Sequence, residues 1–265
     1  MTVLRDKLAF ITGGSSGIGL AVAQRMNARG ATVVLFARRR EALATALDSL
    51  DQPDRGAMFE MDVADRPQVE AVLAEAVAEH GAPDILVNSA GVSYPGYFEQ
   101  LEYDEFDRTV RINLYGTWNT CHVLVPAMKA KGGHIVNVAS VAGLLGVFGY
   151  SAYAASKFGV VGLSESLRAE MRRFGIRVSV LCPPDTDTPM LAAENRRKPP
   201  ETEAIAGAAK VLTTDRVVDD LLRGMRKNQF LIVPGFDGKF TALAKRFSPT
   251  LVAWVTDRLA DSRQA

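Results

Sequence analysis

The sequence contains few of the residues from which metal sites and disulfides are built. Its 265 residues include only 2 cysteines and 3 histidines. His80, His122 and His134 are scattered along the chain without the spacing of metal ligands, so we expect no metal ion. Cys121 and Cys182 both lie in apolar stretches, which favours buried thiols in a reducing compartment over a disulfide.

Long apolar runs and an excess of one charge are also missing. No run approaches the roughly 18 apolar residues that a membrane-spanning helix needs, and the apolar run near the N-terminus is too short for a signal peptide. We therefore expect a cytoplasmic protein. The 31 basic residues nearly balance the 30 acidic ones, so nucleic-acid binding is not expected. What is present is 48% hydrophobic residues, which suits one soluble domain with a full core.

A glycine-rich turn follows the first predicted strand. Residues 7–12 (KLAFIT) are typical of a buried strand, residues 13–19 (GGSSGIG) of a tight turn, and residues 20–29 of a helix. This order is typical of a dinucleotide site, because glycines let the backbone approach a pyrophosphate and the helix N-terminus offers free N–H groups. An ordinary turn between a strand and a helix is the alternative.

Basic residues follow the second predicted strand, residues 32–37 (TVVLFA). About 20 residues past the glycines, NAD-binding sequences place an acidic side chain that binds the ribose 2′-hydroxyl. This chain has Arg38, Arg39 and Arg40 instead, and guanidinium groups suit a 2′-phosphate. At least one of the three is also explained as the solvated start of the next helix. The pattern predicts NADP(H) as the cofactor.

Predicted strands and helices alternate along the rest of the chain. Further strands are expected at residues 57–61, 84–87, 133–138, 176–181 and 230–233. Helices are expected at residues 66–80, 103–131 and 215–227, and within residues 140–173. This alternation indicates parallel βαβ units with right-handed crossovers. We predict a single-domain α/β fold: a Rossmann-type, doubly wound parallel sheet of about seven strands in the order 3-2-1-4-5-6-7, with helices on both faces.

The domain ends in a tail. Residues 1–235 would form the NADP-binding catalytic body and residues 236–265 an amphipathic helical tail of the same domain. Apolar side chains recur in the tail at helical spacing from Phe240 to Leu259, and a break is expected at Pro249. The favoured interpretation is packing against the body or a neighbouring subunit. A helix that touches a membrane surface and a lid over a long acyl chain are the alternatives.

A tyrosine and a lysine stand four residues apart in a helical segment. Tyr153 and Lys157 therefore share one helix face, and Ser140 ends the strand before them. A nearby cation favours the phenolate; moving a tyrosine pKa from about 10 to about 7 takes about 4 kcal/mol. The alternative is an amphipathic tyrosine beside a solvated lysine. Tyr150 has Ala154 four residues on and serves as an internal control.

Together these pieces resemble the short-chain dehydrogenase/reductase family. The matches are TGGSSGIG at residues 12–19, NSAG at residues 88–91 (a small departure from the commoner NNAG), Asn113, Ser140 and YAASK at residues 153–157. The resemblance implies that Tyr153 protonates the carbonyl oxygen of a substrate and that Ser140 binds this oxygen. It further implies that Lys157 binds the nicotinamide ribose and lowers the tyrosine pKa, and that Asn113 holds a water in a proton relay.

The cofactor-binding residues predicted from these patterns and from the resemblance fall in six stretches. They are Gly13, Ser15, Ser16, Gly17, Ile18, Gly19, Arg38, Arg39, Asp62, Val63, Asn88, Ala90, Gly91, Tyr153, Lys157, Pro183, Thr186 and Thr188.

A narrower resemblance lies further along the chain. PPDTDTP at residues 183–189 and ENRRKPPET at residues 194–202 are similar to one branch of the family, the NADPH-dependent reductases of 3-ketosphinganine, as is GLLGVFGYSAYAASKFG at residues 143–159. This implies a lipid-like ketone as substrate and a homodimer or homotetramer. Peripheral contact with a membrane stays open, but no spanning segment is expected. The alternatives are a reductase of another lipid-like or steroid-like ketone, and a non-catalytic NADP-binding scaffold or redox sensor.

Two aspartates in this stretch allow two roles. Asp185 and Asp187 either cap turns through their own backbone or meet an ammonium group of the substrate. Turn capping is favoured for at least one of them.

Overall fold

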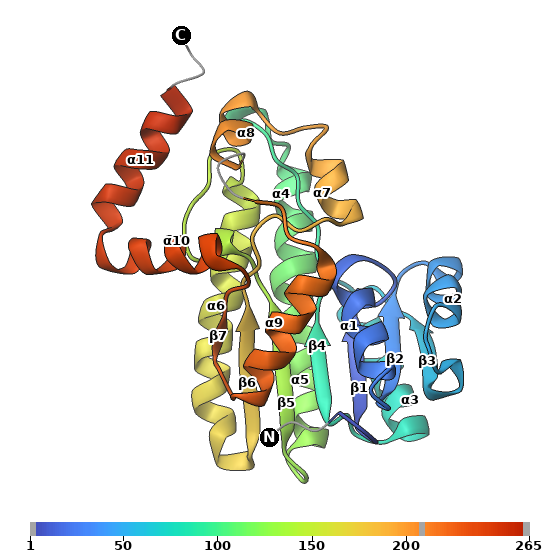
Figure 1. Ribbon diagram of the computed structural model, residues 1–265. Helices are drawn as coiled ribbons and strands as arrows, with labels where there is room; N and C mark the ends of the chain where they lie inside the picture. The colour runs from blue at the N-terminus through green and yellow to red at the C-terminus, as the bar shows by residue number, and fades with distance from the viewer. Residues whose placement is uncertain (1–3, 207–209, 262–265) are drawn as a thin grey trace.

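Seven parallel strands form one sheet at the centre of the computed structural model, which describes residues 4–206 and 210–261 (Figure 1). The strands are β1 (Leu8–Thr12), β2 (Thr32–Ala37), β3 (Gly56–Glu60), β4 (Ile85–Asn88), β5 (Gly133–Val138), β6 (Ile176–Leu181) and β7 (Leu231–Ile232). Their spatial order is β3-β2-β1-β4-β5-β6-β7, with every neighbouring pair parallel, which confirms the predicted sheet. The last strand is shorter than expected, with only two residues.

Helices cover both faces of this sheet. They are α1 (Gly17–Asn27), α2 (Arg40–Asp48), α3 (Arg66–His80), α4 (Tyr103–Val110), α5 (Gly116–Met128), α6 (Ser151–Met171), α7 (Pro189–Glu194), α8 (Pro200–Ala206), α9 (Thr214–Arg226), α10 (Phe236–Phe247) and α11 (Pro249–Asp261). One face packs against α1, α2 and α9, and the other against α3, α5 and α6.

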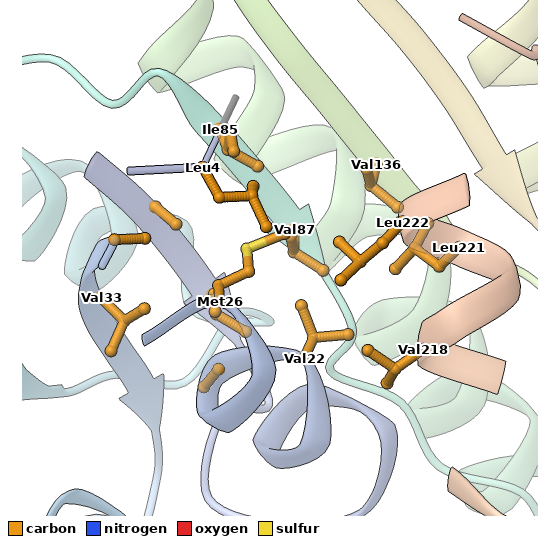
Figure 2. Packing of buried hydrophobic residues seen from close by; sticks show 14 of the residues in the cluster. Leu4, Val22, Met26, Val33, Ile85, Val87, Val136, Val218, Leu221 and Leu222 are labelled. Carbon is orange, nitrogen blue, oxygen red and sulfur yellow. The ribbon is translucent and has the colours of Figure 1, made fainter. Parts of the chain in front are cut away.

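The two faces divide the hydrophobic core because alternate side chains of a strand point in opposite directions. In β1, Ile11 belongs to the cluster that contains Val22 and Met26 of α1, whereas Phe10 belongs to the cluster on the other face. Figure 2 shows Val22 and Met26 among strand side chains, with Leu222 of α9 completing the same cluster. This double burial explains why the strands are continuous apolar runs.

The helix expected at residues 103–131 is not continuous. A five-residue π-helical turn, Arg111–Tyr115, separates α4 from α5, and Asn113 lies at its centre. Single π-helical turns inside helices are common at functional sites, since they shift the backbone groups that follow. The apolar periodicity of the sequence continues through the turn and so does not reveal it.

The tail forms two helices that extend away from the sheet (Figure 1). Helix α10 ends at Phe247 and α11 begins at Pro249, which confirms the predicted break, and α11 packs along α8. Packing against the body does not cover the apolar stripe, since Phe240 is 63% exposed and Trp254 is 55% exposed. The side chain of Leu259 and residues 262–265 of the predicted tail lie outside the described part. Among the described helices, none combines the length and the hydropathy needed to cross a membrane.

Candidate active site

Two adjoining cavities open beside the carboxyl ends of the strands. The larger has a volume of about 320 Å³ and the smaller about 150 Å³. Both are lined by Gly13 and Ser16 from the loop after β1 and by Ala90 and Gly91 from the loop after β4. The strand order reverses between these two neighbouring strands. In an open α/β sheet, this is the crevice in which ligands bind.

The loop between β1 and α1 packs backbone against backbone. At Gly13, φ is +64° and a Cβ would lie 2.8 Å from the Ala90 nitrogen, so the position requires glycine. The Thr12 hydroxyl accepts a hydrogen bond from the Ala90 N–H at 3.3 Å. A Cβ on Gly19 would lie 2.3 Å from the Gly13 oxygen, so helix α1 can approach the loop only because this position is glycine. Gly17, the first residue of α1, lines the larger cavity, where the unpaired N–H groups of a helix start attract anions.

The smaller cavity carries the basic residues that follow β2. Arg38 and Arg39 line it together with Ser15. Asp62 and Val63, from the loop after β3, are also in the lining, and the Asp62 carboxylate accepts a hydrogen bond from the backbone N–H two residues further on, at 3.0 Å. Arg40 is the first residue of α2 and does not line the cavity. It is therefore the solvated start of the next helix, as the alternative interpretation expected for at least one of the three arginines.

The larger cavity contains Ser140, Tyr153 and Lys157. The Ser140 hydroxyl accepts a hydrogen bond from the Ala142 N–H at 3.1 Å and is also hydrogen-bonded to the Tyr153 hydroxyl. Lys157 is 4% exposed, and its ammonium donates to the Val138 oxygen at 2.9 Å. The Lys157 nitrogen lies 5.5 Å from the centre of the Tyr153 ring. The predicted trio is therefore together in one place, with the lysine held by the end of β5.

The electrostatics of Tyr153 differ from the prediction that the nearby lysine lowers its pKa. Burial, and then the negative charge of Glu194, raise the pKa of Tyr153 above its ordinary value, while the hydrogen bond to Ser140 acts in the opposite direction. Burial also lowers the pKa of Lys157 to about 8. Desolvation explains both shifts, because fewer water molecules can stabilise the charged form of either group than in free solution.

Two predicted asparagines have structural roles. The Asn113 side chain accepts from the Val92 N–H at 2.9 Å and donates to the Val92 oxygen at 3.0 Å and the Ser156 hydroxyl at 3.0 Å. Asn88 donates to Asn137 at 2.8 Å and is 3% exposed. Neither residue is in the lining of the two cavities. Their roles toward a cofactor or a relay water stay predictions.

The stretch after β6 forms one wall of the larger cavity. Pro183, Thr186 and Thr188 all line it, as does Asp185. Asp185 is ion-paired to Lys198 at 2.9 Å, a role that neither interpretation of this aspartate included. The bond that caps α7 is made by the Thr188 hydroxyl, which accepts from a backbone N–H at 3.2 Å. The helix cap in this stretch is therefore made by Thr188 and not by one of the two aspartates.

One pair of side chains in this cavity was not predicted from the sequence. The hydroxyl of Tyr150 donates a 2.8 Å hydrogen bond to the carboxylate of Glu194, and both side chains are buried. Glu194 ends the six-residue helix α7 and lines the cavity that contains Tyr153. Its position in a highly charged stretch gave no sign of burial.

The arrangement can bind an extended anionic ligand and transfer a proton. Glycine backbone and a helix start adjoin a basic cavity on one side and a half-buried phenol beside a buried lysine on the other. This donor set fits a dinucleotide whose phosphates lie on the glycine loop. Within the described residues, no group of three or more histidine, cysteine and acidic side chains could hold a metal ion.

Comparisons with known proteins agree with this geometry. A model of the short chain dehydrogenase family matches residues 7–199. The chain is 37% identical to a 3-ketodihydrosphingosine reductase of Mus musculus over 86% of this chain and 71% of that protein. It is 38% identical to a 3-dehydrosphinganine reductase of Danio rerio over 90% of this chain and 74% of that protein. A short-chain dehydrogenase/reductase from Burkholderia phymatum, solved in complex with NAD, superposes with a TM-score of 0.84 at 27% identity, covering 95% of this chain and 96% of that one.

Proposed function

The chain belongs to the short-chain dehydrogenase family and is an oxidoreductase, and from this premise we propose that it reduces 3-ketosphinganine (3-ketodihydrosphingosine) to sphinganine with NADPH. The names of the Mus musculus and Danio rerio relatives denote this reaction. The observation that carries the proposal is the position of Tyr153, Ser140 and Lys157 in a cavity that adjoins the glycine loop and is otherwise mostly apolar.

The binding of NADP(H) follows from the two cavities, and the cofactor would supply the hydride that reduces the ketone. The glycine loop and the start of α1 would hold the pyrophosphate, with Asp62 and Val63 beside the adenine. Arg38 and Arg39, exposed at the smaller cavity, would bind the 2′-phosphate. Lys157 would bind the nicotinamide ribose. On the other side, the nicotinamide would contact the wall formed by Pro183, Thr186 and Thr188.

The proton would come from Tyr153. Its raised pKa keeps the phenol protonated at neutral pH, as a general acid must be before the reaction. Ser140, already hydrogen-bonded to Tyr153, would hold the carbonyl oxygen next to this proton. Lys157 has a pKa of about 8 and is mainly an ammonium at neutral pH, so it would stabilise the phenolate that proton transfer leaves. Lys157 would then return a proton to the Tyr153 phenolate, and a water held near Asn113 would replace the proton that this lysine gives up.

The substrate's hydrocarbon chain would lie along the apolar side of the larger cavity. Leu145 and Val147 line it before α6, and Leu191 and Ile205 line it from α7 and α8. Gly238 brings the beginning of the tail helix α10 into the same lining. Because each buried methylene contributes about 0.8 kcal/mol, such a wall favours a long-chain ketone over a short one.

The rival functions differ in what they leave unexplained. A reductase of another lipid-like or steroid-like ketone would use the same catalytic residues and the same apolar wall. A cofactor-binding scaffold or redox sensor would have no use for a serine, a tyrosine and a lysine joined in one cavity. We therefore favour catalysis.

The setting of the protein is also part of the proposal. We propose a homodimer or homotetramer in the cytoplasm, with peripheral membrane contact as the alternative for the tail. The support is the exposed apolar surface of α10 and α11, which an oligomer would cover. Sedimentation of the intact chain tests the oligomeric state, and a monomer at micromolar concentration would contradict the proposed oligomer.

The proposed reaction is tested by following the hydride. The protein is incubated with 3-ketosphinganine and NADPH that carries deuterium at the transferable position. We expect sphinganine with the deuterium on the carbinol carbon. Recovery of unreacted ketone, or of sphinganine without label, would contradict the proposal.

A further inference from the structure

The larger cavity contains a buried carboxylate that the reduction of a ketone does not require. Glu194 is 7% exposed and lines the cavity together with Ser140 and Tyr153. It accepts a 2.8 Å hydrogen bond from Tyr150, which lies one helical turn before Tyr153. The rings of the two tyrosines have their centres 5.8 Å apart. The carboxylate is thus beside the place where the carbonyl oxygen would be protonated.

The charge of Glu194 has no ion-pair partner in the part of the chain that the structure describes. The neighbouring acid, Asp185, is paired with Lys198 at 2.9 Å, and the Lys198 side chain is 4% exposed. Lys198 acts on Glu194 only from a greater distance, whereas burial raises the pKa of the Glu194 carboxyl. A carboxylate buried without a cation is costly, and a cation that enters the cavity would offset that cost.

The same carboxylate also opposes the proposed acid. Glu194 is the largest electrostatic contributor to the raised pKa of Tyr153, followed by Asp185 in the same direction. Nearby negative charge makes formation of the phenolate harder. A positive charge bound between Glu194 and Tyr153 would remove this penalty when the substrate is in place.

We propose that Glu194 binds a primary ammonium group on the carbon next to the substrate's ketone, and so selects 2-amino-3-ketones. This inference rests on the proposed function, since 3-ketosphinganine carries such an ammonium at C2. A carboxylate that holds the C2 nitrogen places the adjacent C3 carbonyl against Ser140 and Tyr153. Asp185 is less suited to this role because its charge is already used by Lys198.

A structural role is the competing explanation. The bond between Tyr150 and Glu194 joins the start of α6 to the end of α7, and its loss would loosen this wall for any ketone. Glu194→Gln separates the two roles. Glutamine keeps the volume and a carbonyl oxygen that can accept from Tyr150, but it removes the negative charge.

The experiment compares 3-ketosphinganine with its analogue that lacks the amino group. For the wild type, we expect kcat/KM to favour the amino ketone by tenfold or more. In Glu194→Gln this preference should fall by about 10- to 150-fold, the value of a hydrogen bond to a charged group. A wild-type ratio near 1, or a ratio in Glu194→Gln equal to that of the wild type, would overturn the inference.

A second variant keeps the test decisive if Glu194→Gln does not fold. Glu194→Asp retains the charge, but the carboxylate lies one methylene further from the substrate. The kcat/KM preference for the amino ketone over its deaminated analogue should therefore fall several-fold, and an unchanged preference would overturn the inference. Failure of the proposed function has a different signature, because the wild type would then turn over neither C18 ketone. Turnover of both C18 ketones at equal kcat/KM would leave the proposed function intact and contradict only the ammonium site.

Discussion

Two tyrosines three residues apart offer a matched pair for testing the acid. In Tyr153→Phe the proposed proton donor is lost, while the Ser140 hydroxyl keeps its hydrogen bond from the Ala142 N–H. The folded structure should therefore be stable to within about 1 kcal/mol, since no buried partner is left unpaired. Loss of a general acid typically costs 10²- to 10⁴-fold in rate, or about 3–5 kcal/mol of barrier. We expect kcat to fall by this amount with cofactor binding retained.

Tyr150→Phe should show the opposite pattern. The change removes the donor of a 2.8 Å hydrogen bond to a buried carboxylate, Glu194, which costs about 1.5–3 kcal/mol of folding free energy. For a chain of this size, each kcal/mol lowers Tm by about 2–4 °C. The phenol that is lost is not the one bonded to Ser140, so kcat should fall far less than in Tyr153→Phe.

Two quantities are measured for both variants and for the wild type: kcat at saturating NADPH, and Tm. The expected result is a cross-over, with low kcat and normal Tm for Tyr153→Phe, and lower Tm with largely retained kcat for Tyr150→Phe. Equal losses of kcat in the two variants would refute the assignment of the acid, as would an active Tyr153→Phe enzyme.

Three further predictions concern the cofactor, the tail and the lysine. Arg38→Ala should weaken the binding of NADPH by about 10- to 150-fold and the binding of NADH much less. Arg40→Ala, outside the cavity, is the control. An equal loss of affinity for both cofactors would make the role of Arg38 structural. If the tail covers three or four methylenes of the substrate, deleting residues 239–265 should raise KM for a C18 ketone more than for a short analogue, by the equivalent of about 2–3 kcal/mol of binding free energy. Unchanged chain-length selectivity would exclude a guiding role for the tail. Burial lowers the pKa of Lys157 from 10.5 to about 8, so between pH 8 and 10 the unfolded chain binds more protons than the folded chain. The free energy of unfolding should therefore rise by about 2–3 kcal/mol over this pH range, relative to the Lys157→Met variant. Parallel pH curves for the two proteins would contradict this prediction.

The fold and the glycine loop could be predicted because they depend on local patterns. Apolar runs such as residues 7–12 and 32–37 become strands buried on both faces, and the order of the sheet follows from the handedness of the crossovers. Gly13 and Gly19 were recognisable because close backbone packing leaves no room for a side chain there. The i, i+4 spacing likewise placed Tyr153 and Lys157 on one face.

The predictions that failed depend on contacts between distant parts of the chain. The pKa of Tyr153 is raised because burial and Glu194 act on it, and neither was visible from the lysine four residues on. Glu194 is 44 residues from its partner Tyr150, in a stretch whose charges resemble a solvated surface. Asp185 likewise finds Lys198 only once the chain has turned through α7. Burial of these charges is a property of the tertiary structure.

The proposed function is tested most directly by the substrate selectivity of the intact chain. NADPH consumption is measured with 3-ketosphinganine and with a panel of unrelated ketones, including a steroid ketone and a short-chain ketone. We predict the highest kcat/KM for 3-ketosphinganine, with sphinganine as the product and NADPH preferred to NADH. Turnover of another ketone at a higher kcat/KM, or no turnover of 3-ketosphinganine by protein that binds NADPH, would contradict it.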